Sequence, residues 1–256
     1  MSVDGIQLLA HRGWASRYPE NTCLALEAAL RAGVPAVEFD IQLSADSVPM
    51  VIHDATLMRT AGVAGNVLAS RAAELAAVSV HEPARFGARF AGTRMPSLAD
   101  VVELLGGWPH ARAFAEVKSE SARRYGIDVT VARVLEVLGP IADRAVVISF
   151  VEGVVVSARA RGASAVGWVL ERYDGPTRET AASLAPEYLI CDHRKLPPQP
   201  HSLWSGPWQW VSYEIGDATH ALALVERGVG IIESFAAGDL AADPRLGAAR
   251  APGERS

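Results

Sequence analysis

The stretch LLAHRGWASRYPENT, residues 8–22, joins an apolar run to a loop and a helix start, and places His11 and Arg12 at the end of that run. Adjacent cationic side chains are poorly suited to a protein core. They suit the rim of a site that receives an anion, because both can donate hydrogen bonds to it. The stretch therefore predicts a buried strand that opens on an anion-binding site, followed by a helix.

Short apolar runs alternate with Ala- and Leu-rich helical segments over most of the 256 residues. The predicted strands are Ile6–His11, Ala36–Leu43, Val48–His53, Ala113–Lys118, Ala145–Phe150, Ala165–Leu170, Tyr188–Cys191, Trp210–Ile215 and Gly230–Glu233. The predicted helices are Asn21–Ala32, Leu98–Leu105, Ile127–Leu138, Glu152–Arg161, Thr177–Leu184 and Ala218–Arg227. This repeated strand-then-helix order predicts an α/β fold with a parallel sheet covered by helices, and the length suits a (β/α)8 barrel.

The segments between these elements indicate how the chain is organised. We expect one barrel domain over residues 1–247, with an irregular insertion, Ala55–Met95, after the second strand region. Residues 248–256 are predicted to form a disordered tail. Hydroxyl side chains suited to helix capping stand at Thr22 and Ser97. Glycines expected to end helices are Gly33, Gly106, Gly139, Gly162 and Gly228.

The composition argues against several classes of protein. The net charge is −5 and no run of Lys or Arg forms a basic patch, which disfavours nucleic-acid binding. Cys23 and Cys191 belong to no CxxC pair, so neither a zinc site nor a disulfide framework is expected. The N-terminal residues lack the features of a signal peptide, and no apolar run is long enough for a membrane span. We therefore expect a cytoplasmic protein without stable membrane association.

Three carboxylates stand at or near the ends of predicted strands. Residues two apart in a strand point to the same side, so Glu38 and Asp40 face one way, as do Glu116 and Lys118. At the mouth of a barrel, the three carboxylates would form an oxygen cage suited to Mg²⁺ or Ca²⁺. The alternative is that each is an ordinary surface residue at a strand end. The apolar Phe39 between Glu38 and Asp40 favours the cage.

Two histidines and two cationic side chains complete the set of groups that breaking a phosphodiester would need. His11 and His53 each end an apolar run, and breaking a phosphodiester requires one group that accepts a proton and another that donates one. A lone histidine is more often structural, and the other histidines are assigned no role. Arg12 and Lys118, with a divalent cation, would outweigh the three carboxylates by about one positive charge and attract a phosphodiester anion.

These motifs, in this order, resemble the glycerophosphodiester phosphodiesterase family. The similarity runs from about Leu8 to Phe235, and its specificity lies in the order and spacing of the motifs. They read HRG at 11–13, PENT at 19–22, E-x-D at 38–40, HDATLMRT at 53–60, FGARFAGTRMPSLAD at 86–100 and E-x-K at 116–118.

The resemblance implies a TIM barrel with a small inserted segment over its mouth. It implies hydrolysis of glycerophosphodiesters to sn-glycerol 3-phosphate and an alcohol, with one divalent cation, Mg²⁺ or Ca²⁺, and Mn²⁺ as a further candidate. The implied site has Glu38, Asp40 and Glu116 on the metal, His11 and His53 as the acid–base pair, and Arg12 and Lys118 on the phosphate. Attack by the glycerol 2-hydroxyl, through a cyclic phosphate, and direct attack by water both stay open.

The resemblance weakens toward the C-terminus. Relatives often have Trp-Thr-Val-Asn on the seventh strand and Thr-Asp on the last, where this chain has Tyr213-Glu214-Ile215-Gly216 and Glu233-Ser234. We expect Tyr213, Glu214 and Glu233 to line the substrate pocket, with the two carboxylates favouring a cationic head group. The alternative is that both glutamates pair with nearby arginines.

Two other functions compete with this assignment. An apolar groove lined by Trp14, Phe86 and Phe90 would favour a lysophospholipase D that acts on lipids with one chain left. A noncatalytic protein that binds glycerophosphodiesters is disfavoured, because no acid, base or metal ligand is missing. Within PENT, Glu20 can reach the metal site, whereas Asn21 and Thr22 are typical of a turn and a cap.

Overall fold

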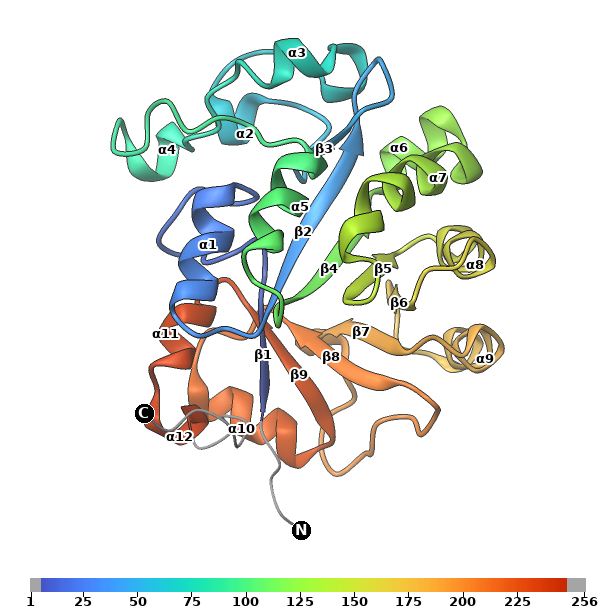
Figure 1. Ribbon diagram of the computed structural model, residues 1–256. Coiled ribbons are helices and arrows are strands. Elements are labelled where there is room, and N and C mark those ends of the chain that lie inside the picture. The colour runs from blue at the N-terminus through green and yellow to red at the C-terminus, as the bar shows by residue number, and fades with distance from the viewer. Residues whose placement is uncertain (1–5, 248–256) are drawn as a thin grey trace.

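Eight parallel strands close into a barrel in the computed structural model, which describes residues 6–247 (Figure 1). The closure joins the two ends of the chain, because β1 pairs with β2 on one side and with β9 on the other. This confirms the predicted (β/α)8 barrel. The barrel strands are β1 Gln7–Ala10, β2 Ala36–Leu43, β4 Arg112–Val117, β5 Ala145–Ser149, β6 Ala165–Val169, β7 Tyr188–Asp192, β8 Gln209–Tyr213 and β9 Val229–Ser234.

One predicted strand does not belong to the barrel. β3 (Pro49–Val51) lies within the predicted strand Val48–His53 and runs antiparallel to β2, with Ile41 opposite Val51, so it stands outside the parallel barrel. A parallel neighbour needs a long crossover connection. Here the chain turns back within a few residues, through Ser47 at a φ of 60°.

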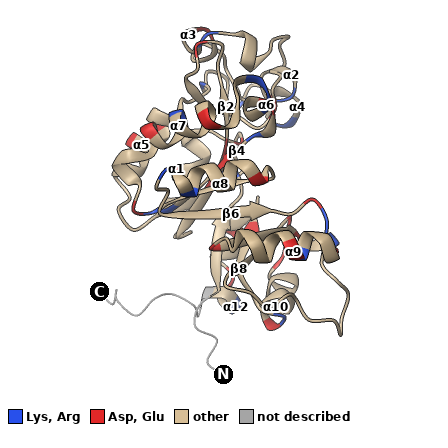
Figure 2. Cartoon of the chain, turned by 90° about the vertical axis from the view of Figure 1, so that its right-hand side faces the viewer, with Lys and Arg blue, Asp and Glu red and all other residues tan. Residues whose placement is uncertain are grey.

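The predicted helices surround the barrel. Figure 2 shows Asp and Glu on α5, α8 and α9, with Lys and Arg interspersed. Ala25 donates its N–H to the Thr22 side chain, and Ser97 forms a capping box with Asp100, as capping predicts. The six helices are α1 Cys23–Arg31, α5 Leu98–Gly106, α7 Ile127–Leu138, α8 Glu152–Ala160, α9 Gly175–Leu184 and α10 Ala218–Glu226.

Some helix ends and short helices differ from the prediction. Gly33, Gly162 and Gly228 have the left-handed backbone that favours glycine after a helix, whereas Gly106 lies inside α5 and Gly139 has a φ of −42°. The sequence analysis missed short helices because they are polar or only a few residues long: α6 Ser119–Tyr125, α11 Ala237–Ala241 and α12 Pro244–Gly247.

Two apolar layers support the barrel. The outer layer lies between strands and helices. The inner layer fills the barrel with side chains at alternate strand positions, and it forms a closed floor below the strand ends where polar residues begin. Its members are Leu9, Ala36, Phe114, Val146, Ile148, Val169, Tyr188, Ile190, Val211 and Ile231.

The segment between β3 and α5 folds at one edge of the barrel mouth, at the top of Figure 1. It holds a third apolar cluster, which includes Leu57, Val67, Leu75 and Met95, so the predicted insertion has a core of its own. Its elements are α2 Met58–Ala61, the 3-10 turn Val67–Ala69, α3 Ala72–Leu75 and α4 Pro83–Phe86.

Two expectations concern the ends of the chain and the membrane. The predicted disordered tail, residues 248–256, lies outside the described residues. Within residues 6–247, none of the helices has both the length and the apolar composition that crossing a bilayer demands.

Candidate active site

The carboxyl ends of β1, β2, β4 and β9 bring polar side chains together above the apolar floor. Asp40 lies opposite Glu116 in the β2–β4 register, and Leu9 lies opposite Glu233 in the β1–β9 register. His11 follows β1 and is 7% exposed. Barrel closure therefore gathers residues from positions 11 to 233 into one cluster.

Two groups of described residues have the chemistry of a metal site: the predicted Glu38, Asp40 and Glu116, and a second made of His11, Glu38 and Glu233. The first has only carboxylates. Each offers an oxygen atom, and these atoms lie within 4.8 Å of one another. All three side chains are buried, and Glu38 Oε1 has no hydrogen-bond partner among the described residues. Hard carboxylate oxygens in a compact group fit Mg²⁺ or Ca²⁺, and a buried orphan oxygen is what a cation would satisfy.

Arg12 and Lys118 contact this group through different oxygens of Asp40. Lys118 Nζ lies 2.7 Å from Glu116 Oε1 and 3.1 Å from Asp40 Oδ1. Arg12 Nε lies 3.0 Å from Asp40 Oδ2 without hydrogen-bond alignment, so we treat the contact as an ion pair. The Arg12 backbone N–H donates to Glu38 Oε2 at 3.0 Å. Both cations therefore lie beside the carboxylates, where a phosphate could reach them.

Gly13 explains why the turn after His11-Arg12 needs glycine. Its φ is 79°, a conformation that residues with a Cβ rarely adopt. A Cβ at this position would also lie 2.5 Å from the backbone carbon of Ala25 in α1. The glycine lets the β1–α1 turn pack against the helix and fixes the direction in which His11 and Arg12 leave the strand.

The pKa values of the carboxyls move in opposite directions. Burial, with Asp40 and Glu233 nearby, raises the pKa of Glu38 well above its usual range. Burial also opposes ionisation of Asp40, but Lys118 and Arg12 outweigh it and hold the pKa of that carboxyl far below its usual range. Burial likewise raises the pKa of Glu116. One carboxylate is therefore stabilised by fixed cations, while its neighbours carry an electrostatic cost.

The two histidines have different surroundings. Burial and the neighbouring Arg12 lower the pKa of His11 well below its usual range, so its ring is neutral near neutral pH. His11 Nε2 lies 3.9 Å from Glu38 and 4.0 Å from Glu233. The His53 side chain is 33% exposed, and its Nδ1 lies 2.6 Å from Asp54 Oδ1. The site thus contains a buried neutral imidazole and a more open one that a carboxylate orients.

The PENT motif forms a frame around this site. Asn21 donates to Asp40 Oδ2 at 2.8 Å and accepts the Asp40 N–H at 3.0 Å, which fixes that carboxylate. Glu20 accepts hydrogen bonds from Arg12 and Arg59 at 2.7–2.9 Å and points to them rather than to the carboxylate cage. Arg59 also donates to Asp54 and so links the frame to the loop that carries His53.

The chain was then compared with known proteins. The model of the glycerophosphoryl diester phosphodiesterase family matches residues 11–175, which is more than half of the chain. The chain belongs to this family. One relative, a glycerophosphodiester phosphodiesterase of Bacillus altitudinis, is 34% identical over 147 residues, which cover 57% of this chain and 59% of that protein. Another, from Caldanaerobacter subterraneus, is 38% identical over 99 residues, covering 39% of this chain and 40% of that protein.

The chain therefore matches 40% and 59% of the length of these two curated relatives. Solved structures extend the similarity of fold to nearly the whole chain. An Oleispira antarctica phosphodiesterase in complex with the product sn-glycerol-3-phosphate has a TM-score of 0.79 and 24% identity, covering 91% of this chain and 94% of that one. A Silicibacter pomeroyi protein has a TM-score of 0.79 and 21% identity, covering 93% and 92%. At these identities the structures show the shared barrel fold.

Three residues predicted to line the substrate pocket of this phosphodiesterase-family chain occupy different environments. Tyr213 lies with its ring 6.0 Å from that of His11. Glu214 is exposed and has a φ of 68°, whereas Glu233 is 3% exposed beside His11. Neither glutamate has an ion pair with Arg or Lys among the described residues, so the structure offers no support for the alternative that arginines neutralise them.

Phe235 is a residue of this family member's site that the sequence analysis missed. Its ring stacks on His11 with the centroids 4.3 Å apart and the planes 15° apart, and Arg12 lies over the ring at 5.6 Å. Phe235 lies in the turn directly after β9, which ends at Ser234, so strand alternation does not place its ring and no local pattern signalled the stacking.

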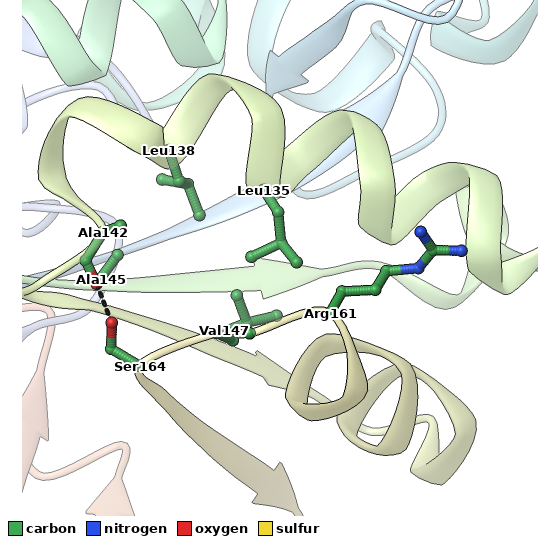
Figure 3. Close-up of a pocket in the computed structure, with 9 residues that line it drawn as sticks. Leu135, Leu138, Ala142, Ala145, Val147, Arg161 and Ser164 are labelled. Atoms are coloured by element: carbon green, nitrogen blue, oxygen red, sulfur yellow. Dashed lines mark hydrogen bonds between the residues drawn. The ribbon is translucent and has the colours of Figure 1, made fainter.

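Two pockets differ in their relation to the site of this phosphodiesterase-family barrel. One, drawn in Figure 3, lies between α7 and the β5–β6 region; its lining includes Leu135, Leu138, Val147 and Arg161 and none of the carboxylates or histidines above. The other, of about 540 Å³, opens beside Glu116, Lys118 and His53. The second pocket is therefore the one that adjoins the chemistry.

Proposed function

We propose that the protein hydrolyses glycerophosphodiesters to sn-glycerol 3-phosphate and an alcohol. The observation that carries this proposal is the meeting of two histidines, three carboxylates and two cationic side chains at one end of the barrel. The matched family model covers residues 11–175, which include β2 to β6. The names of the curated relatives and the product bound to the Oleispira protein agree with this reaction.

We infer that Glu38, Asp40 and Glu116 hold one divalent cation, Mg²⁺ or Ca²⁺, with Mn²⁺ as a further candidate. Such an ion supplies Lewis-acid polarisation of a phosphoryl oxygen when bound. Arg12 and Lys118 already contact Asp40, so their donors lie within reach of a phosphate beside the carboxylates. The guanidinium can bind two phosphate oxygens and the ammonium adds a point charge, which together orient the diester and stabilise growing negative charge.

His11 and His53 form the proposed acid–base pair. The neutral ring of His11 is suited to accept a proton from the attacking hydroxyl. His53 is suited to protonate the leaving alkoxide, because Asp54 binds its Nδ1 and leaves Nε2 available. Both histidines serve equally when the attacking hydroxyl belongs to water or to the glycerol arm, so both routes are compatible with the site.

A direct assay tests this function. Release of glycerol 3-phosphate would be measured from glycerophosphocholine, glycerophosphoethanolamine and glycerophosphoinositol, with Mg²⁺, Ca²⁺, Mn²⁺ or EDTA. We expect metal-dependent release that falls about a hundred-fold or more in Glu38→Gln, because the variant loses a carboxylate of the cage. Glu136→Gln is the matched control and should keep full activity, because the Glu136 side chain on α7 is 69% exposed. Absence of release from every diester by folded protein would refute the proposal.

A lysophospholipase D activity is the second candidate. Four half-buried aromatic side chains form a row from the β1–α1 turn to the insertion. The distance between ring centroids is 6.0 Å from Trp14 to Tyr18, 5.8 Å from Tyr18 to Phe90, and 5.1 Å from Phe90 to Phe86. They offer an apolar surface for one acyl chain. Choline release from lysophosphatidylcholine that exceeds release from glycerophosphocholine would favour this candidate, and the reverse order would exclude it as the main activity.

A further inference from the structure

The pocket beside the site extends the active site in one direction only. It lies between the His53 loop, the start of α6 and the ends of β5 and β6, with a volume of about 540 Å³. It contacts the site through His53, Glu116 and Lys118, whereas His11 is not among its lining residues. Beyond these three, its walls include Phe150, Glu120 and Glu171.

The position of His53 indicates which part of the diester enters this pocket. This step rests on the proposed function, in which His53 protonates the leaving alkoxide. The alcohol arm begins at that oxygen, so it must leave the phosphate on the His53 side. A pocket that His53 lines, and that has room for more than a three-carbon glycerol arm, therefore receives the head group.

The walls of the pocket are acidic with one aromatic face. Phe150 is half-buried and packs against the inner barrel cluster, so its ring is held in place. Glu171 is exposed just after β6, and no ion pair to it is found within residues 6–247. Burial opposes ionisation of Glu120, but a backbone hydrogen bond and Gln42 lower the pKa of that carboxyl overall, so it is charged near neutral pH.

Two cations of the pocket, Lys118 and Arg123, reduce the charge of these carboxylates only in part. Arg123 lies 3.6 Å from Glu120, and its side chain is 69% exposed. An ion pair in such contact with water is weak, and it leaves Glu171 without a partner. The pocket therefore combines a fixed aromatic ring with a carboxylate that has no counter-charge, and a positively charged ligand satisfies both.

We propose that this pocket binds the alcohol arm of diesters whose head group carries an ammonium, with Phe150 and Glu171 as the residues that determine specificity. The ring faces the ammonium, and the carboxylate supplies the opposite charge. A neutral polyol head group gains neither interaction. The pocket differs from the site predicted from sequence, because Tyr213, Glu214 and Glu233 are absent from its lining.

The test compares glycerophosphocholine with its neutral carbon isostere, in which a tert-butyl group replaces the trimethylammonium. The two esters share shape and leaving-group geometry, so the ratio of their kcat/KM values isolates the effect of charge. We expect the wild type to prefer the choline ester, and Glu171→Gln and Phe150→Leu each to reduce that preference by about two- to five-fold. Glu179→Gln, on exposed α9, is the charge-matched control and should keep the wild-type ratio. Thermal melting of each variant confirms that it is folded.

Each other outcome rejects the proposal in a distinguishable way. Equal kcat/KM for the two esters in the wild type would reject the ammonium subsite and leave the hydrolase intact. A ratio that changes in Glu214→Gln but not in Glu171→Gln would place the head group on the Tyr213 side of the mouth. Equal losses on both esters in Glu171→Gln would indicate that the pocket holds the glycerol arm. No turnover of either ester would reject the proposed function together with this inference.

Discussion

At the scale of single residues, the site concentrates negative charge in the barrel. Glu38, Asp40, Glu116 and Glu233 are all less than a tenth exposed. Asp40 is ionised because Lys118 and Arg12 contact it, but burial and the other carboxyls raise the pKa values of Glu38 and Glu233. Desolvated carboxylates without counter-charge are costly, and a divalent cation removes that cost. The excess of buried negative charge at these residues therefore favours binding of a divalent cation.

The raised pKa of Glu38 gives a prediction on stability. Its folded pKa exceeds the ordinary value of 4.5, so in EDTA the folded protein holds a proton that the unfolded chain releases. The contribution to stability is complete below that ordinary value and is lost as pH rises through the folded pKa. As pH rises above 4.5 in EDTA, we expect the Tm of the wild type to decline relative to the Tm of Glu38→Gln. The comparison between the two proteins is needed because the lowered pKa of His11, which both share, adds stability as pH rises.

Thermal melting with and without Mg²⁺ completes this test. Mg²⁺ should raise the Tm of the wild type near neutral pH, because it binds only the folded protein, and should have little effect on Glu38→Gln. Glu136→Gln should follow the wild type in both conditions. A Tm in EDTA that follows the same pH dependence in the wild type and in Glu38→Gln would show that Glu38 is ionised without help from a cation.

At the scale of elements, the insertion is fixed to the barrel by polar contacts. Arg59 of α2 donates to Glu20 and Asp54, and the Glu20 N–H donates to Glu82 Oε1 at 2.6 Å. Arg85 of α4 donates to the Ala15 carbonyl at 2.6 Å. The insertion also has an apolar core of its own. It is therefore a wall of the mouth whose attachment orients Asp54 and, through it, His53.

The role of Arg59 can be tested by removing its guanidinium. Arg59→Met leaves Glu20 with Arg12 as its remaining partner and releases Asp54, so we expect about 1–2 kcal/mol lower stability and a lower kcat/KM. Arg71→Met is the control, because the Arg71 side chain is 72% exposed and lies 3.7 Å from Asp46. Urea denaturation and diester turnover measure the two effects. Equal changes in both variants would mean that the network does not support the site.

The elements also show what a sequence can predict. α7 matches its predicted bounds, Ile127–Leu138, because its twelve residues have a clear apolar face. α6 has the polar sequence SESARRY and buries only Ser121 and Ala122, so periodicity gave no signal. β3 was recognised as apolar, but its direction depends on how the chain turns back on β2. Local patterns predict the type of element, and tertiary pairing decides its direction.

At the scale of the whole molecule, barrel closure assembles the site from both ends of the chain. Strand alternation and the expected barrel together predicted that Glu38, Asp40 and Glu116 gather at one mouth, and an oxygen of each lies within 4.8 Å of the others. The burial of Glu233 beside His11, and the stacking of Phe235, depend on the pairing of β9 with β1. That contact joins positions more than two hundred residues apart, and no local pattern encodes it.

Leu9 is the residue through which this closure can be tested. It lies in β1 opposite Ala36 on one side and Glu233 on the other, and its side chain is fully buried in the barrel. Leu9→Ala leaves a cavity under the site, so we expect it to cost about 2–5 kcal/mol and to lower the Tm by roughly 5–20 °C. Leu24→Ala is the control, because Leu24 is 38% exposed on α1.

Circular dichroism and diester turnover, both followed on heating, show whether the active site needs the closed barrel or only the strands that carry its residues. If the site exists only in the closed barrel, activity and secondary structure disappear over the same temperature range in the wild type and in Leu9→Ala. Activity lost well before the secondary structure would mean that β1 and β9 separate while the other strands stay paired. In that case the barrel has a weak seam at the active site, and bound Mg²⁺ should shift the loss of activity upward more than the loss of secondary structure.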